Sequence, residues 1–238
     1  MTTLLLIRHG VTDATGRRLG GRTDAPLNEA GRAQARAAGE RVAALPVRAV
    51  YASPLRRAWE TAELVARACR RTPVRADGLV EVEYGRWTDR PLRDVARTKQ
   101  WEVVQHRPSL VAFPEGETLR GVQQRAVDTV EALVAAHRRE VIAAVSHADV
   151  IKAVVAFYLG MPLDLFQRLV VTPASVTVLE LGPGARPALL RLGDDGPLDP
   201  AAFRRPPRRR GRRNSPSAGD RGRDGETGRD DGDGGGDG

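Results

Sequence analysis

The chain has 238 residues, a hydrophobic fraction of 41% and a formal net charge of +8. This length is enough for one sizeable domain, and since only 4% of the residues are aromatic, its core must rest on aliphatic side chains. The single cysteine, Cys69, excludes an intrachain disulfide. The apolar run from Leu4 to Ile7 is far too short for a signal peptide or a membrane span. We therefore expect a cytoplasmic protein without a membrane partner.

The composition changes at Arg204. Residues 204–238 hold ten arginines against seven acidic residues, and apolar side chains nearly vanish. Such a segment cannot bury enough surface to offset the entropy of ordering it. We predict a folded domain over residues 1–203 and a disordered tail over 204–238. The tail has no aromatic residues to stack on bases, so we do not expect a nucleic-acid partner, although a weak electrostatic contact to RNA, DNA or an acidic surface is the alternative.

Strand-like and helix-like segments alternate along residues 1–203. Short apolar runs predict buried strands, amphipathic periodicity predicts helices, Asn28 is placed to cap the first helix, and Pro54 is placed in the first turn of the second. The expected elements are a strand at 3–7, a helix at 27–45, a strand at 48–53, a helix at 54–69, a helix at 116–138, a strand at 140–147, a helix at 148–160 and a final pair of strands at 175–182 and 186–193. This alternation predicts an α/β sandwich around a mainly parallel sheet.

Polar side chains follow three of the predicted strands at the point where each strand ends. Arg8 and His9 follow the first strand, Ser53 ends the second, and His147 ends a later one. Ligands bind at the carboxyl edge of open α/β sheets, so these residues should share one crevice with one or both of Arg56 and Arg57. The remaining histidines, His106 and His137, lie in polar stretches and are predicted to be surface residues.

Two histidines beside arginines suit an anion better than a cation. No HxxxH pair or Cys/His cluster indicates a metal site, and Arg8 next to His9 would repel a metal ion. The planar guanidinium group binds phosphate oxygens through two parallel hydrogen bonds, and helices starting after Ser53 and His147 would add backbone N–H donors. A neutral histidine in such a pocket can also attack phosphorus, because a covalent intermediate divides one difficult step into two easier ones.

Such a mechanism needs a proton donor for the leaving oxygen. The stretch "LVEVEYGRWTD" offers Glu81 and Glu83, which would point to the same side of a strand-like segment. The residues alone leave open that either glutamate is an ordinary surface carboxylate.

Six segments, in order, resemble the histidine phosphatase (phosphoglycerate-mutase-like) superfamily, and together they extend over roughly residues 3 to 192. The segments are "LLLIRHGVT", "GRTDAPLNEAGRAQA", "YASPLRRAWETAE", "LVEVEYGRWTD", "FPEGET" and "AAVSHADVIKAVVAFYLG". The chain also resembles the subgroup named putative phosphomutase. The resemblance implies a three-layer αβα sandwich with a mixed six-stranded sheet, and it implies that neither a metal nor an organic cofactor is needed.

The resemblance also implies roles for single residues. His9 matches the nucleophile that becomes phosphohistidine, and Arg8, Arg57 and His147 match the other groups of the phosphate pocket. Glu81 matches the residue that gives and later takes the proton. The chain departs from the family pattern near the substrate mouth, where Thr15 and Gly20 stand for the usual Asn and Gln, and also at Asp89 and Ala148, which stand for glycines.

The substrate is expected to be a small phosphorylated metabolite whose identity the sequence does not give. The residues expected to contact it are Thr12, Thr15, Gly21, Arg22 and Ala148. The loops expected to set specificity are 12–22, 86–106 and 111–118. The resemblance around Glu81 favours a phosphatase, in which water accepts the phosphoryl group. A phosphoglycerate-mutase-type enzyme and a non-catalytic phospho-ligand binder are the alternatives, and the oligomeric state is open.

Overall fold

The computed structural model describes residues 1–184 and 186–196. The boundary predicted near residue 203 and the tail predicted over 204–238 lie outside these residues. Within the described ranges, no helix combines the length and the apolar character needed to cross a membrane.

One mixed sheet of six strands organises the described part of the chain, in the order β3-β2-β4-β1-β5-β6. The neighbouring pairs β3–β2, β2–β4 and β4–β1 are parallel, whereas β5 runs antiparallel to β1 and β6 runs antiparallel to β5. The strands are β1 Thr2–Arg8, β2 Val47–Ala52, β3 Pro73–Arg75, β4 Val141–Ser146, β5 Val176–Leu181 and β6 Ala188–Asp194. The mixed six-stranded sheet expected from the resemblance is confirmed.

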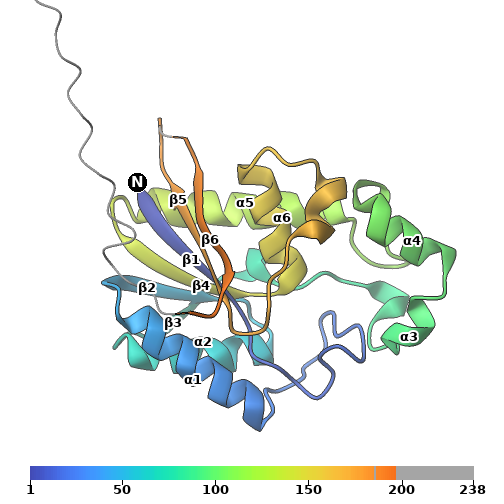
Figure 1. Cartoon of the computed structure of the whole chain (residues 1–238), viewed down its shortest axis with the longest axis horizontal. Helices are drawn as coiled ribbons and strands as arrows, with labels where there is room; N and C mark the ends of the chain where they lie inside the picture. The colour runs from blue at the N-terminus through green and yellow to red at the C-terminus, as the bar shows by residue number, and fades with distance from the viewer. Residues whose placement is uncertain (185, 197–238) are drawn as a thin grey trace, which may run out of the picture. The chain divides into compact units, whose positions relative to one another are not determined.

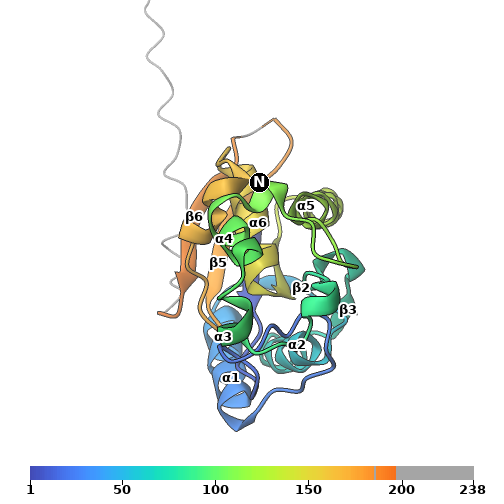
Figure 2. The same ribbon diagram turned by 90° about the vertical axis from the view of Figure 1, so that its right-hand side faces the viewer.

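Helices cover both faces of the sheet, as Figures 1 and 2 show: α1 and α2 lie on one face, and α5 and α6 lie on the other. The helices are α1 Glu29–Ala43, α2 Arg56–Ala68, α3 Leu92–Val95, α4 Lys99–His106, α5 Leu119–Ala136 and α6 Ala148–Tyr158, and the short 3-10 helices are η1 Asp77–Leu79, η2 Gly85–Trp87, η3 Pro108–Leu110 and η4 Leu163–Arg168. The layers are those of the predicted αβα sandwich.

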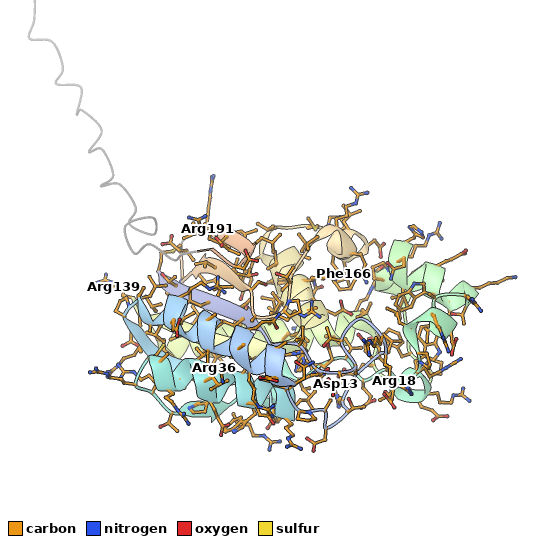
Figure 3. The ribbon with its side chains drawn as sticks, turned by 60° about the horizontal axis from the view of Figure 1, so that its bottom comes forward. Asp13, Arg18, Arg36, Arg139, Phe166 and Arg191 are labelled. Carbon is orange, nitrogen blue, oxygen red and sulfur yellow. The ribbon has the colours of Figure 1, made fainter. Side chains whose placement is uncertain are left out.

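Strand β1 shows why its sequence is a continuous apolar run. Leu4 and Leu6 pack into the core beneath α5 and α6, and Leu5 and Ile7 pack into the core beneath α1 and α2. Since successive side chains of a strand point to opposite faces, a strand covered on both sides must be apolar at every position. The outer side of α1 is polar, and Arg36 stands on it (Figure 3).

Most of the predicted elements are present. Helices α3 and α4 and the short 3-10 helices were not predicted, and there are three further differences. Asn28 caps α1 as expected, its side chain accepting a hydrogen bond from Gly31 N–H at 2.9 Å. Pro54 does not lie in the first turn of α2, because this helix begins two residues later, after Leu55. The exposed three-residue strand β3 was not predicted, since it is too short to leave a pattern. The strand-like segment around Glu81 and Glu83 is not a strand; it is an irregular link between η1 and η2.

Candidate active site

The carboxyl ends of β1, β4 and β2 lie side by side, because these strands are neighbours in the sheet. Arg8 pairs in register with Ser146, so His9 and His147 follow at the same level, and their ring centroids are 5.1 Å apart. Ser53, at the end of β2, donates its backbone N–H to Val145 O. The convergence of the three polar strand ends is therefore present in the structure.

His9 is buried and held in one tautomer. Its Nδ1 lies 2.7 Å from Gly10 O, and since a carbonyl oxygen can only accept, Nδ1 must carry the ring proton. Burial, followed by the charge of Arg57, holds the pKa of His9 well below its usual value, so the ring is neutral near pH 7. The lone pair of Nε2 then faces Arg57, whose Nε donates to it at 3.2 Å. A neutral imidazole with a lone pair directed into the pocket is what a nucleophile requires.

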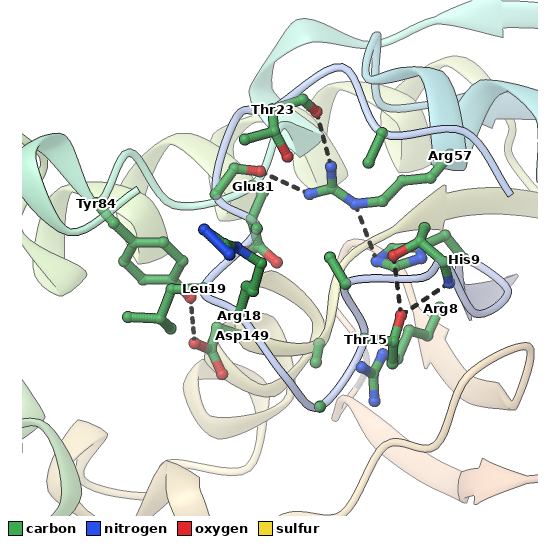
Figure 4. A pocket seen from close by; sticks show the side chains of 17 residues that line it. Arg8, His9, Thr15, Arg18, Leu19, Thr23, Arg57, Glu81, Tyr84 and Asp149 are labelled. Atoms are coloured by element: carbon green, nitrogen blue, oxygen red, sulfur yellow. Dashed lines mark hydrogen bonds between the residues drawn. The ribbon is translucent and has the colours of Figure 1, made fainter. Parts of the chain in front are cut away.

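Arg57 connects His9 with the loop that follows β1. Besides the bond to His9, its Nη1 donates to Thr23 O at 3.0 Å and its Nη2 donates to Gly21 O at 2.6 Å (Figure 4). The side chain is buried, whereas the neighbouring Arg56 is exposed and pairs with Glu60 on the surface of α2. Of the two arginines considered from the sequence, Arg57 is therefore the one in the pocket.

Within the described part of the chain, two buried nitrogens at this edge of the sheet lack a hydrogen-bond partner. They are Arg8 Nε and His147 Nδ1. His147 Nε2 lies 2.7 Å from Ser53 Oγ, which in turn accepts a weak bond from Leu55 N–H. The Ser53 proton can thus go to Nε2, which leaves the ring proton of His147 on Nδ1. Unsatisfied buried donors are costly, so their presence together indicates a site built to receive an acceptor such as a phosphate oxygen.

Burial opposes the positive charges of the two arginines in the pocket, Arg8 and Arg57. Burial lowers the pKa of both Arg8 and Arg57, and the Glu81 carboxylate acts against this effect in each case. Arg8 is anchored by its Nη1, which donates to Val171 O at 2.7 Å. A bound dianion would offset the same cost, so the two guanidinium groups favour an anionic ligand.

Glu81 is positioned by an arginine of α5 rather than by a strand. Arg125 donates to the carbonyl oxygens of Gly78, Val80 and Glu81 at 2.7 to 3.2 Å, which fixes the irregular link that carries the acid. The Glu81 side chain is buried, and its Oε2 lies 3.8 Å from His147 Nδ1. Glu83 turns instead toward Arg22 and the backbone of Gly85, so only Glu81 of the two candidates lies in the pocket.

The environment of Glu81 favours its protonated form. Burial and then the nearby Asp149 raise the pKa of Glu81 to about 7, against the lowering effect of Arg57 and of the Val82 N–H bond. A carboxyl with such a pKa can donate a proton near neutral pH and take one back later.

Sequence reasoning missed two residues that line the same pocket. The Tyr84 hydroxyl donates to Asp149 Oδ2 at 3.0 Å, and both side chains lie beside Glu81 (Figure 4). Burial, followed by Asp149, raises the pKa of Tyr84 well above its usual value, so the phenol stays a donor. A signal for Asp149 existed, since it directly follows Ala148 in the first turn of α6, where side chains border the crevice.

The loop after β1 forms the mouth of the pocket. Of the residues expected to contact substrate, four line the pocket, namely Thr12, Thr15, Gly21 and Ala148. Arg22 does not; its guanidinium contacts Glu81 O at 3.2 Å and Glu117 Oε1 at 2.9 Å, and so supports the link that carries the acid. Arg18 lines the mouth, and its Nε contacts Asp89 Oδ1 at 2.8 Å. No residue of 86–106 or 111–118 lines this pocket, although residues 91–93 and 96 border a groove next to it.

The loop after His9 packs on α1 through two glycines. A Cβ on Gly31 would lie 2.0 Å from Val11 O, and a Cβ on Gly10 would lie 2.4 Å from Gly31 O. Only glycine permits this approach. The position of His9 relative to the helix layer thus depends on backbone contact rather than on side-chain packing.

The two other histidines lie outside the pocket. His106 is exposed, as predicted. His137 is not an ordinary surface residue, because its Nε2 lies 2.7 Å from the Tyr51 hydroxyl and its Nδ1 lies 2.6 Å from Glu140 Oε2. Among the described residues, no group of three or more His, Cys, Asp and Glu side chains is placed to hold a metal ion.

The fold and the site together define an α/β enzyme that places a neutral histidine beside buried donors for an anion. A sequence profile of the histidine phosphatase superfamily (branch 1) matches residues 4–195, and the chain belongs to this superfamily.

Relatives carry the names of both phosphatases and mutases. Phosphoserine phosphatase 1 of Hydrogenobacter thermophilus is 27% identical over 188 residues, which cover 76% of this chain and 87% of that protein. Probable phosphoglycerate mutase GpmB of Erwinia tasmaniensis is 31% identical over 185 residues, which cover 74% of this chain and 84% of that protein. The solved structure of Bacillus stearothermophilus YhfR matches with a TM-score of 0.75 at 34% identity, covering 82% of this chain and 98% of that one.

Proposed function

We propose that the protein hydrolyses a small phosphomonoester through a phosphohistidine at His9, without a metal ion. The observation that carries this proposal is the tautomer of His9: Nδ1–H is bound to Gly10 O, the ring is neutral, and the Nε2 lone pair faces into the pocket. Binding an anion alone would be served better by a protonated imidazole, whereas attack on phosphorus needs this neutral form.

In the first step His9 Nε2 attacks phosphorus while the bond from phosphorus to the ester oxygen breaks. Glu81 gives its proton to that oxygen, which leaves as an alcohol. The ring gains positive charge as the N–P bond forms, and the Nδ1–H bond to Gly10 O stabilises it. Arg8, Arg57 and the Nδ1–H of His147 donate to the non-bridging oxygens, where charge is held in the transition state.

In the second step water attacks the phosphohistidine. Glu81, now a carboxylate, takes a proton from the water as the N–P bond breaks. His9 returns to its neutral form, and Glu81 is again protonated. The raised pKa of Glu81, about 7, suits both directions of proton transfer near neutral pH.

The proposal is tested by phosphate release from small phosphomonoesters in the presence of EDTA. Turnover should persist under EDTA. The phosphoenzyme should be lost on acid treatment and should survive alkaline treatment. His9→Ala should abolish both the phosphoenzyme and turnover. Robust turnover by folded His9→Ala would contradict the mechanism.

The same experiment separates the alternatives. Transfer of the phosphoryl group between the hydroxyls of phosphoglycerate, faster than release of phosphate, would indicate a mutase. Tight binding of phosphate esters without a phosphoenzyme would indicate a binding protein. The presence of Glu81 argues against a binding protein, because binding phosphate needs no proton donor and a carboxylate beside a bound anion weakens binding unless it is protonated.

The remaining parts of the proposal concern surroundings and contacts. We place the protein in the cytoplasm, acting on a small phosphorylated metabolite without a nucleic-acid partner. Thr12, Thr15, Gly21 and Ala148 are proposed to contact the substrate, since they line the pocket. Arg22 is proposed to support Glu81 instead.

A further inference from the structure

The pocket has a wall that the phosphoryl-transfer steps do not use. Tyr84 and Asp149 line it beside Glu81, and the Tyr84 hydroxyl donates to Asp149 Oδ2 at 3.0 Å (Figure 4). Because Glu81 must reach the ester oxygen, the side of the pocket next to Glu81 receives the alcohol part of the substrate. Asp149 therefore faces the leaving group rather than the phosphoryl group.

The carboxylate of Asp149 can accept more hydrogen bonds than it receives from the residues that the structure describes. Oδ2 accepts from Tyr84, and Oδ1 lies 3.4 Å from Lys152 Nζ, which also contacts Gln167 Oε1 at 3.0 Å. Two carboxylate oxygens offer about four acceptor positions, so capacity remains toward the pocket. Tyr84 and Lys152 hold the side chain in place, and its exposed fraction of 21% leaves it accessible from the pocket.

The charges on this side of the pocket differ from those on the phosphate side. Arg8 and Arg57 are the cations assigned to the phosphoryl oxygens. Arg18, at the mouth, has its Nε bound to both the backbone oxygen and Oδ1 of Asp89 at 2.8 Å, so a carboxylate already partly compensates its charge. The leaving group thus meets the carboxylate of Asp149 on its wall, where Lys152 Nζ lies 3.4 Å from Oδ1.

We infer that Asp149 is a specificity residue that selects phosphate esters whose alcohol carries an ammonium or hydroxyl donor and rejects those whose alcohol carries a carboxylate. The inference rests on the proposed function, since it assumes that Glu81 marks the leaving-group side. A donor on the alcohol would complete the hydrogen bonding of Asp149, whereas a carboxylate there would meet a like charge in a partly buried site.

Three esters of equal length test this inference. Phosphoethanolamine, ethylene glycol monophosphate and phosphoglycolate place an ammonium, a hydroxyl and a carboxylate, respectively, at the end of a two-carbon alcohol. The measured quantity is kcat/KM for phosphate release, which reports formation of the phosphoenzyme and departure of the alcohol. The phosphoenzyme is the same for all three esters, so differences among them arise before its hydrolysis.

Two variants at position 149 separate charge from shape. Asp149→Asn removes the charge at equal size, and Asp149→Glu keeps the charge. We expect the wild type to prefer phosphoethanolamine to phosphoglycolate, and Asp149→Asn to lower this ratio of kcat/KM values by about tenfold or more, since the interaction of two charges in a partly buried site is at least that large. Asp149→Glu should retain most of the preference. Asp128→Asn, on the exposed face of α5 and outside the pocket, makes the same change in net charge and should leave the ratio unchanged.

The outcomes distinguish this inference from the proposed function. A wild type that prefers phosphoglycolate, or a ratio that Asp149→Asn does not change, overturns the inference while phosphate release still supports the proposed function. Hydrolysis of p-nitrophenyl phosphate without hydrolysis of either donor-bearing ester also overturns it. Absence of any phosphoenzyme overturns the proposed function, and the inference with it. Should Asp149→Asn not fold by circular dichroism, Asp149→Ala replaces it with the same expected direction.

Discussion

The two sides of the pocket are built in different ways. The proposed phosphate side consists of residues at the ends of adjacent strands, with His9 after β1 and His147 after β4, and of Arg57 in the first turn of α2. The proposed leaving-group side consists of Glu81 and Tyr84 on an irregular link, and of Asp149 in α6. The first side presents hydrogen-bond donors and positive charge, whereas the second presents carboxyl groups and a phenol.

This difference shows which residues of the pocket are held rigidly by the fold and which can be changed with less effect on the rest of the structure. The positions of the strand ends are fixed by the sheet, whose close-packed core leaves little conformational freedom. The position of the link that carries Glu81 is fixed by single contacts such as those of Arg125. Changes on the phosphate side should therefore affect all substrates alike, and changes on the other side should depend on the leaving group.

Among the variants that compare the two sides, Glu81→Gln is expected to have the largest effect. With alkyl phosphates, kcat/KM should fall by about 10²- to 10⁴-fold, because the alkoxide can no longer take a proton from position 81. With p-nitrophenyl phosphate the loss in kcat/KM should be much smaller, since its leaving group needs no proton and kcat/KM does not include hydrolysis of the phosphoenzyme. Steady-state kinetics on both esters checks this, and an equal loss on both would contradict the assignment of Glu81 to the leaving group.

A somewhat smaller effect, independent of the leaving group, is expected for Arg57→Gln. Removing one charged donor from the phosphoryl oxygens should cost about 10²- to 10³-fold in kcat/KM for alkyl and aryl esters alike. Arg56→Gln is the matched control, because Arg56 pairs with Glu60 on the surface and should tolerate the change. Comparable losses in the two variants would show that the effect is one of general charge.

The pH dependence of kcat/KM tests the role of Glu81 on the leaving-group side. Glu81 acts as an acid only while protonated, and its pKa is raised to about 7, so activity should decline above that pH by about tenfold per unit. The second ionisation of a phosphate ester, at a pKa of about 6, is complete in this range and does not obscure the decline. Asp149→Asn removes a charge that raises the pKa of Glu81, so the decline should begin at a lower pH. A decline that starts at the same pH in this variant would contradict the coupling.

The other groups that face Glu81 do not oppose the fall in its pKa expected for Asp149→Asn. Arg57 and Arg8 lower its pKa and remain in place in the variant, while His147, beside it, stays neutral because its own pKa is lowered. With the negative neighbour removed and the positive ones retained, ionisation of Glu81 can only become easier.

The smallest effect is expected for Gly31→Ala, and it concerns stability more than chemistry. A Cβ at this position would lie 2.0 Å from Val11 O, so the loop after His9 or helix α1 must shift. We expect a loss of about 1–3 kcal/mol in the free energy of unfolding, measured by denaturant titration. Ala33→Ser, on the exposed side of the same helix, should cost no more than about 0.5 kcal/mol. Equal stability of Gly31→Ala and the wild type would show that the close approach is not required.

The phosphate side could be predicted from the sequence because its residues follow elements with strong patterns. The continuous apolar run before Arg8 and the one before His147 identify buried strands, and parallel strands bring their ends together. The choice of Arg57 over Arg56 needed the resemblance to the family, since two arginines in adjacent positions have the same local pattern.

The leaving-group side was predicted less completely. Glu81 came from the resemblance, but its segment was expected to be a strand and is an irregular link held by Arg125. Contacts of that kind join residues 44 to 47 positions apart and leave no periodic pattern. Arg22 was expected at the substrate for its charge, yet its nearest partners are Glu117 and the Glu81 carbonyl oxygen. Tyr84 has no distinguishing sequence signal, because a tyrosine is common in any loop. The signal for Asp149 is its position directly after Ala148 at the expected start of a helix.

The register of β1 against β4 has a consequence for how faithfully the active site forms. Arg8 opposes Ser146, and the same alignment places Leu4 opposite Ile142 in the core under α5 and α6. A slip of one residue would turn every side chain of β1 to the wrong face, separating His9 from His147 and mispacking the core in one event. The register that packs the core correctly is therefore the same register that brings His9 and His147 together. A correctly folded chain cannot have these two histidines misplaced.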